Sequence, residues 1–178
     1  MRIRRRAAGF AIGASLHLVA AQHATAHQAA SAPEPALRDV LLAGWTDTGQ
    51  KLIKLAEEFP EDKYDFRPVP EVRTFADQLR HVAFWNIFVQ KTARGEPIDA
   101  AQNELSKADY PSKAKIVGAL KSTFEDATAE LRKESSAPAA KRARLWVTFI
   151  EHSGEHYGQL VVYYRLNGIV PPASRPSK

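Results

Sequence analysis

Apolar residues recur at steps of three and four in four stretches of the chain, and each stretch is followed by a proline or a glycine. This spacing is typical of amphipathic α-helices, because it gathers the apolar side chains on one face. Helices are predicted over residues 34–59, 74–92, 112–133 and 140–167. Strand signals are few. The pattern therefore predicts an all-α protein, a four-helix bundle formed by residues 34–172.

The connections between the predicted helices differ in length. Those before the second and fourth helices are short enough to join antiparallel neighbours. Roughly twenty residues separate the second helix from the third, enough to extend along a bundle at about 3.3 Å per residue. We therefore expect the second and third helices to run parallel.

Residues 1–26 resemble a secretory signal peptide. Arginines at positions 2, 4, 5 and 6 precede an apolar stretch, and Ala24-Thr25-Ala26 fits a cleavage site. An uncleaved anchor is the alternative, but the apolar stretch is short for crossing a bilayer. We predict a periplasmic or secreted protein that leaves the membrane after cleavage. Residues 27–33 are expected to be a flexible mature N-terminus, and residues 173–178 a disordered tail.

Charge and cysteine content narrow the kinds of partner and site. The chain has 25 basic and 20 acidic residues, a net charge of +5. Without the four arginines of residues 1–26 the balance is 21 against 20, or +1, which argues against nucleic-acid binding. The chain has no cysteine, so any metal site must use nitrogen and oxygen ligands.

Three histidines interrupt the apolar stripes of the second and fourth helices. His152 and His156 are four residues apart, so they lie one turn apart on the same face of a helix. On the fourth predicted helix, both fall on the stripe that also contains Leu145, Phe149, Gln159, Tyr163 and Leu166. On the second predicted helix, His81 falls on the stripe that contains Thr74, Gln78, Trp85 and Phe88. We expect all three imidazoles to point into one bundle interior.

The histidines have simpler interpretations as well. A single inward histidine such as His81 is more often a hydrogen-bonded core residue than a ligand. The pair of His152 and His156 favours a metal ion, because two buried imidazoles need partners for several nitrogens, at about 1–3 kcal/mol for each unsatisfied group.

The segment from His152 to His156 also fits the H-x-x-E-H pattern of inverted zinc proteases, with Glu155 as general base. Those enzymes take a further carboxylate ligand downstream, and residues 157–178 contain no Asp or Glu. Glu155 also lies about 80° from the midline of the two histidines on a helix. We therefore reject the protease interpretation.

Two segments carry a resemblance to a known family. The segment Phe75-Ala-Asp-Gln-Leu-Arg-His81-Val and the segment from Glu151 to Pro172, with H-x-x-x-H followed by Gly-Gln-Leu, resemble the DinB (YfiT-like) family of metalloenzymes. The resemblance implies a four-helix bundle of up-down-down-up topology. It also implies a divalent metal bound by His81, His152 and His156. Tyr157 stands where many members have arginine.

The resemblance leaves the reaction open. The metal is expected to be Zn, Ni, Fe or Mn, with open coordination positions for a small-molecule substrate. We expect a metal-dependent hydrolase or transferase; relatives include thiol-dependent transferases and isomerases. The alternative is a non-catalytic metal- or ligand-binding bundle of the cell envelope. Relatives that form dimers suggest a homodimer, and Gln78, Trp85, Gln159 and Tyr163 are candidate pocket residues.

Overall fold

The computed structural model describes residues 34–176 of the 178-residue chain. The predicted signal peptide (residues 1–26), the predicted flexible segment (residues 27–33) and the last two residues of the predicted tail lie outside the described residues.

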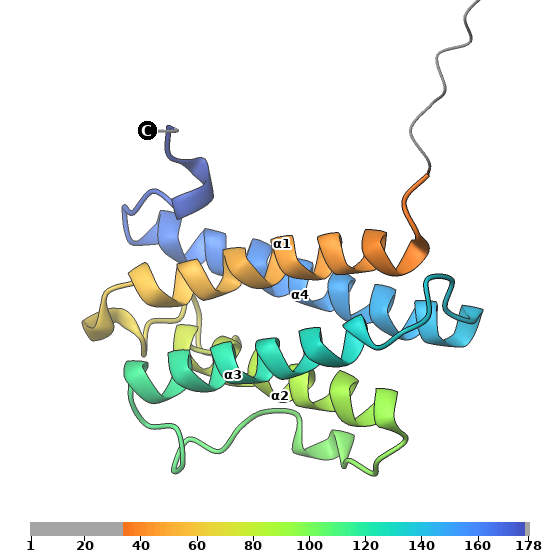
Figure 1. The fold of residues 1–178 in the computed structure, drawn as a ribbon. Helices are drawn as coiled ribbons and strands as arrows, with labels where there is room; N and C mark the ends of the chain where they lie inside the picture. The colour runs from red at the N-terminus through yellow and green to blue at the C-terminus, as the bar shows by residue number, and fades with distance from the viewer. Residues whose placement is uncertain (1–33, 177–178) are drawn as a thin grey trace, which may run out of the picture. The chain divides into compact units, whose positions relative to one another are not determined.

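Four long helices make up the described part of the chain (Figure 1). They are α1 (Leu37–Glu58), α2 (Phe75–Arg94), α3 (Lys113–Arg132) and α4 (Ala140–Leu166). Three short 3-10 helices lie outside them: η1 (Glu61–Lys63), η2 (Ala100–Gln102) and η3 (Pro172–Ser174). No strand occurs between residues 34 and 176. The predicted all-α fold class, a four-helix bundle, is confirmed.

The ends of α2 follow from local chemistry. At its N-terminus the Thr74 hydroxyl oxygen accepts a hydrogen bond from the Asp77 backbone N–H at 3.1 Å, and the hydroxyl donates to the Asp77 carboxylate at 2.6 Å. At its C-terminus Gly95 adopts φ +74, a left-handed conformation that glycine reaches without steric cost. This start and stop set the register of α2, and with it the direction in which His81 points.

Contacts between α1 and α4 show that these two helices run in the same direction. Trp45 of α1 packs edge-on against Trp146, near the start of α4, with ring centroids 5.7 Å apart. Farther along both helices, the Tyr164 hydroxyl donates to the Leu55 carbonyl at 2.6 Å. Residue numbers therefore increase together along this pair.

Contacts between α2 and α3 show a second parallel pair. The Asn86 side-chain amide donates to the Thr123 hydroxyl at 3.3 Å, and Arg94 donates to the Glu130 carboxylate at 2.9 Å. The colours in Figure 1 show the long connection between these helices returning along the bundle, and α2 and α3 running opposite to α1 and α4. As a result α2 lies antiparallel to α4, the two helices that carry His81 and the pair of His152 and His156.

Two of the predicted apolar stripes are only partly correct. On α1, Leu37 and Val40 continue the apolar spacing of the predicted helix over residues 34–59, yet they are 44% and 50% exposed. On α4, Gln159 and Leu166 were placed inward but are exposed. The buried residues of α4 are Trp146, Phe149, Ser153, His156, Leu160, Tyr163 and Tyr164. Because α4 packs against both α1 and α2, its buried face is centred between these neighbours rather than on the predicted line.

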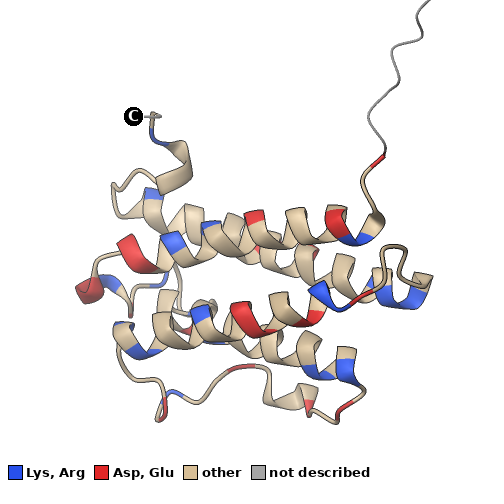
Figure 2. Ribbon diagram, in the orientation of Figure 1, with Lys and Arg blue, Asp and Glu red and all other residues tan. Residues whose placement is uncertain are grey.

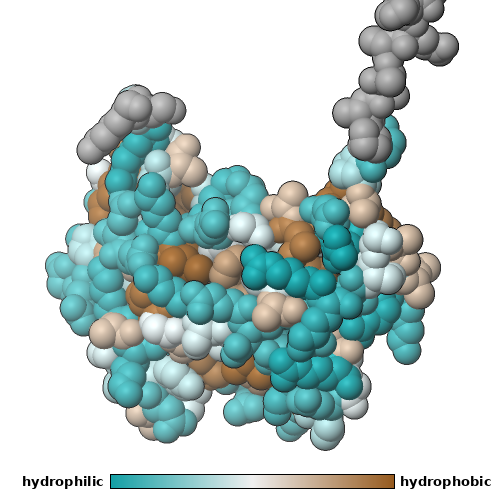
Figure 3. Space-filling model, in the orientation of Figure 1, coloured by the Kyte–Doolittle hydropathy of each residue, from teal (hydrophilic) through white to brown (hydrophobic). Residues whose placement is uncertain are grey.

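The surface is polar and mixed in charge. Figure 3 shows hydrophilic residues over most of one face, with apolar residues visible between the helices. Figure 2 shows acidic and basic residues intermixed along the helices. One surface ion pair joins Arg175, just after η3, to Glu58 of α1, and η3 lies where the predicted tail begins. Within residues 34–176 no helix is both long enough and apolar enough to cross a membrane.

Candidate metal centre

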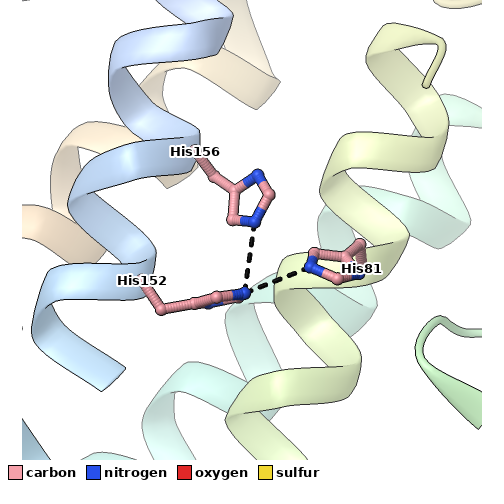
Figure 4. Close-up of side chains that lie close together, drawn as sticks. All are labelled: His81, His152 and His156. Atoms are coloured by element: carbon pink, nitrogen blue, oxygen red, sulfur yellow. Dashed lines mark hydrogen bonds between the residues drawn. The ribbon is translucent and has the colours of Figure 1, made fainter. Parts of the chain in front are cut away.

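The structure brings the three predicted histidines together between α2 and α4 (Figure 4). The Nε2 atom of His152 lies 3.1 Å from Nε2 of His81 and 3.2 Å from Nε2 of His156. All three ligand atoms lie within 4.8 Å of one another. His81 and His156 are buried and His152 is half-buried, so the cluster lies inside the bundle with one side toward solvent.

An aromatic wall lies beside the cluster. Trp85, one turn after His81, stacks on Phe149 of α4 with ring centroids 5.7 Å apart. The Trp85 ring also lies 5.6 Å from the His152 ring, and its indole nitrogen is the one buried side-chain polar atom of the described chain without a hydrogen-bond partner. Trp85 and Phe149 therefore keep water from one side of the imidazoles.

Hydrogen bonds on the outer nitrogens orient two of the rings. His81 Nδ1 lies 2.7 Å from the Asn103 backbone carbonyl, and His156 Nδ1 lies 2.7 Å from Oε1 of Gln78. The Gln78 amide nitrogen donates to Gln159 Oε1 at 2.8 Å, which fixes Gln78 Oε1 as the acceptor toward His156. Both Nδ1 atoms must therefore carry the proton in a neutral ring, leaving Nε2 free to bind a metal.

The connection between α2 and α3 is held against the site by a buried arginine. Arg80 is 2% exposed, pairs with Asp77 and donates to the Tyr110 carbonyl at 3.1 Å. Its own backbone carbonyl accepts from the Leu105 N–H at 3.3 Å. Asn103 has φ +56, and this left-handed turn belongs to the segment that presents its carbonyl to His81.

The three Nε2 atoms have too few protons to satisfy one another. Nε2 of His81 and of His156 carries a lone pair, because Nδ1 holds the proton in both rings. Nε2 of His152 is close to both, but even as the N–H tautomer it donates to only one of them. Within the cluster at least one Nε2 lone pair therefore has no donor, and a buried polar atom left without any partner costs about 1–3 kcal/mol.

A divalent ion fits this arrangement. Metal–nitrogen bonds to histidine are about 2.0–2.1 Å long, so two nitrogens on one ion at angles of about 90–109° lie about 2.8–3.4 Å apart. The observed separations of 3.1 and 3.2 Å fall in that range. The donor set, three neutral imidazoles on one side of the ion, also leaves positions for other ligands.

The surroundings keep the imidazoles neutral. Burial, and after it the positive charge of Arg73, lowers the pKa of His81 to about 4. Burial and the two neighbouring histidines lower the pKa of His152 to about 3. Burial also lowers the pKa of His156, and Arg73 contributes again. Protons therefore compete weakly for these nitrogens at neutral pH, which favours metal binding.

A cleft of about 940 Å³ opens beside the cluster. His156 and Gln78 form part of its wall, and Arg73, Glu104 and Tyr163 line it farther out. The site therefore has an access route large enough for a small molecule.

The other predicted pocket residues have different positions. Gln78 binds His156 directly, whereas Gln159 is exposed, accepts a hydrogen bond from Gln78 and lies close enough to His156 to raise its pKa against the effect of burial. The Tyr163 hydroxyl donates to the Arg73 carbonyl at 2.5 Å. Glu155, the general base of the rejected protease interpretation, is exposed.

Sequence reasoning missed Arg73, Asn103 and Glu104. All three lie in irregular segments, where apolar periodicity gives no signal.

Comparison with known proteins gives one family match. The model of a family described as the DinB superfamily matches residues 45–160, a segment that contains all three histidines. No curated protein matches the chain.

Proposed function

The chain belongs to the DinB superfamily, and on that basis we propose that it binds one divalent metal ion through Nε2 of His81, His152 and His156 and acts on a small molecule. A bound ion supplies Lewis-acid chemistry at the inner end of the cleft. One observation supports the proposal above the others. The Nε2 atom of His152 lies at metal-ligand separations from Nε2 of both His81 and His156, and the rings of His81 and His156 are oriented by hydrogen bonds on the opposite nitrogen.

The chain's own residues would hold and enclose the ion. Asn103 and Gln78 fix the proton of His81 and of His156 on Nδ1. Trp85 and Phe149 cover one side of the cluster, and the cleft reaches the cluster at His156. The cleft supports the proposal of a metal-dependent hydrolase or transferase, because such an enzyme must admit its substrate.

A second candidate is a non-catalytic metal- or ligand-binding bundle. It is favoured by the exposure of Glu155, the acidic residue next to the ligands on α4, which leaves the site without a positioned carboxylate base from that helix. For either function we propose a periplasmic or secreted location, supported by the composition of residues 1–26.

Metal content tests the proposal most directly. The protein is purified without a histidine tag or added metal, its ions are measured by mass spectrometry, and it is then titrated with Zn²⁺, Ni²⁺, Fe²⁺ and Mn²⁺. We expect one tightly bound ion per chain, with marked losses in His81→Ala, His152→Ala and His156→Ala. His27→Ala is the matched control, because His27 is the one other histidine of the predicted mature chain.

Two results would contradict the proposal. Wild type that neither carries nor binds a stoichiometric ion rules out the metal centre, and His81→Ala with unchanged affinity rules out the three-ligand arrangement. Activity on ester, phosphoester and thiol-transfer substrates then separates the two candidates. Metal-dependent turnover supports the enzyme, and its absence across the panel supports the binding protein.

A further inference from the structure

Arg73 is the one arginine that lines the cleft beside His156. It immediately precedes the N-cap of α2, and its backbone is fixed because its carbonyl accepts the Tyr163 hydroxyl. Its positive charge is close enough to lower the pKa of each of the three histidines. The guanidinium therefore lies at the same cleft as His156, the histidine through which the cleft meets the cluster.

The side chain of Arg73 is weakly held. Within residues 34–176 its one hydrogen bond runs from Nε to a Glu104 carboxylate oxygen at 3.4 Å, and the two side chains are 35% and 43% exposed. Arg80, seven residues later, is buried at 2% exposure with two partners that occupy its guanidinium. An arginine has five N–H donors in a planar fork, so most donors of Arg73 remain available.

The charges around the cleft are unbalanced once an ion is bound. Three neutral imidazoles bring no negative charge to a divalent ion, and Arg73 adds a further positive charge nearby. Among the acids that line the cleft, Asp77 already pairs with Arg80, and Glu71 is exposed. Only Glu104 faces Arg73, at the long distance given above.

We infer that the cleft takes an anionic small molecule whose carboxylate or phosphate group pairs with Arg73 while another donor atom of the molecule reaches the three Nε2 atoms. Arginine suits this role because its fork matches both oxyanions. Glu104 is then an internal competitor, which occupies Arg73 until the anion replaces it. This inference rests on the proposed metal centre, whose substrate class it specifies.

The test uses the chain loaded with one equivalent of Co²⁺, with succinate as the anionic probe and succinamide as its neutral analogue. Binding is measured by calorimetry and by the visible spectrum of Co²⁺, which responds only to ligands at the metal centre. We expect succinate to bind and succinamide not to bind. Arg73→Gln should weaken succinate about tenfold or more, since it removes a charge-assisted contact.

A second variant should change the affinity for succinate in the opposite direction. Glu104→Gln removes the competing carboxylate, so succinate should bind about threefold to tenfold more tightly. Arg67→Gln is the matched control, because Arg67 is an exposed arginine nearby on the chain whose side chain donates to the Pro70 carbonyl. Its affinity for succinate should stay that of wild type. Arg73→Gln should leave Co²⁺ affinity unchanged or slightly raised, since it removes a repulsive charge.

The outcomes distinguish this inference from the metal proposal. Wild type that binds Co²⁺ but prefers succinate no more than succinamide overturns the anion inference alone. A loss of succinate binding in both Arg73→Gln and Glu104→Gln also overturns it, because a structural role would move both in one direction. If Arg73→Gln does not fold, Arg73→Lys, which keeps the charge, must retain most succinate binding. Wild type that takes up no Co²⁺ overturns the proposed metal centre itself.

Discussion

Replacing Gln78 by leucine should weaken metal binding without unfolding the bundle. Gln78 is 5% exposed, and its carbonyl oxygen is the acceptor for His156 Nδ1–H at 2.7 Å. Leucine has a similar size but no acceptor, so the ring loses the bond that orients it and keeps the proton on Nδ1.

The size of the effect follows from that single bond. Loss of such an orienting partner lowers metal affinity about tenfold to a hundredfold, which is about 1.4–2.7 kcal/mol at 25 °C. The cost of an unsatisfied buried N–H, about 1–3 kcal/mol, covers the same range. Competition with a chromophoric chelator for Zn²⁺ measures the change, and circular dichroism shows whether the fold is retained.

Two further variants isolate the acceptor. Gln159→Leu should change affinity by less than about threefold, because Gln159 is exposed and accepts its hydrogen bond from the amide nitrogen of Gln78. Gln78→Glu keeps an acceptor oxygen and should retain wild-type affinity or exceed it. The reasoning is refuted if a folded Gln78→Leu protein binds Zn²⁺ as tightly as wild type. It is also refuted if Gln159→Leu loses as much Zn²⁺ affinity as Gln78→Leu.

Three other perturbations have defined outcomes. Gly49→Ala places a Cβ 2.0 Å from the Phe124 ring and should lower the free energy of unfolding by about 1–3 kcal/mol in urea denaturation. In Gly118→Ala the added Cβ meets nothing within 4 Å, so this variant should raise the free energy of unfolding by about 1 kcal/mol. Equal effects of the two substitutions would contradict the packing argument. The folded state holds the pKa of His152 at about 3, against an ordinary value of 6.5. Between these pH values the unfolded chain binds more protons than the folded chain, so the metal-free protein should lose stability as pH falls from 6.5 toward 3. A His152→Leu variant whose stability falls equally steeply with pH would contradict this prediction. N-terminal sequencing of the exported protein should begin near residue 27, and a chain that retains residues 1–26 would disprove cleavage.

The sequence predicted the helices well, because their signals are local. Apolar periodicity, the Thr74 cap and the glycines after α2 and α4 placed the ends of all four helices within about three residues of those observed. The convergence of His81 with His152 and His156 could also be predicted, since each lies on an inward face. The helices and the inward face on which each histidine lies depend only on residues within a few turns of one another.

The features that the sequence did not predict depend on which neighbours each helix packs against. Gln159 and Leu166 were placed inward because they continue the line of His152 and His156, yet both are exposed. The stripe of one helix does not show that α4 packs against two partners, which bury Ser153 and Leu160 instead. In the same way, Asn103 meets His81 only because the connection after α2 folds back across the bundle.

The separation of the ligands along the chain has a consequence for the order of events in folding. His81 and His152 are 71 residues apart, and the segment between them contains all of α3. The three nitrogens exist as a set only after α4 has docked against α2, so the proposed three-ligand site forms only once the bundle has assembled. Once bound, the ion acts as a cross-link that closes this long loop. It should therefore slow the separation of α2 from α4 and prolong the lifetime of the folded chain, with little effect on how fast the chain folds.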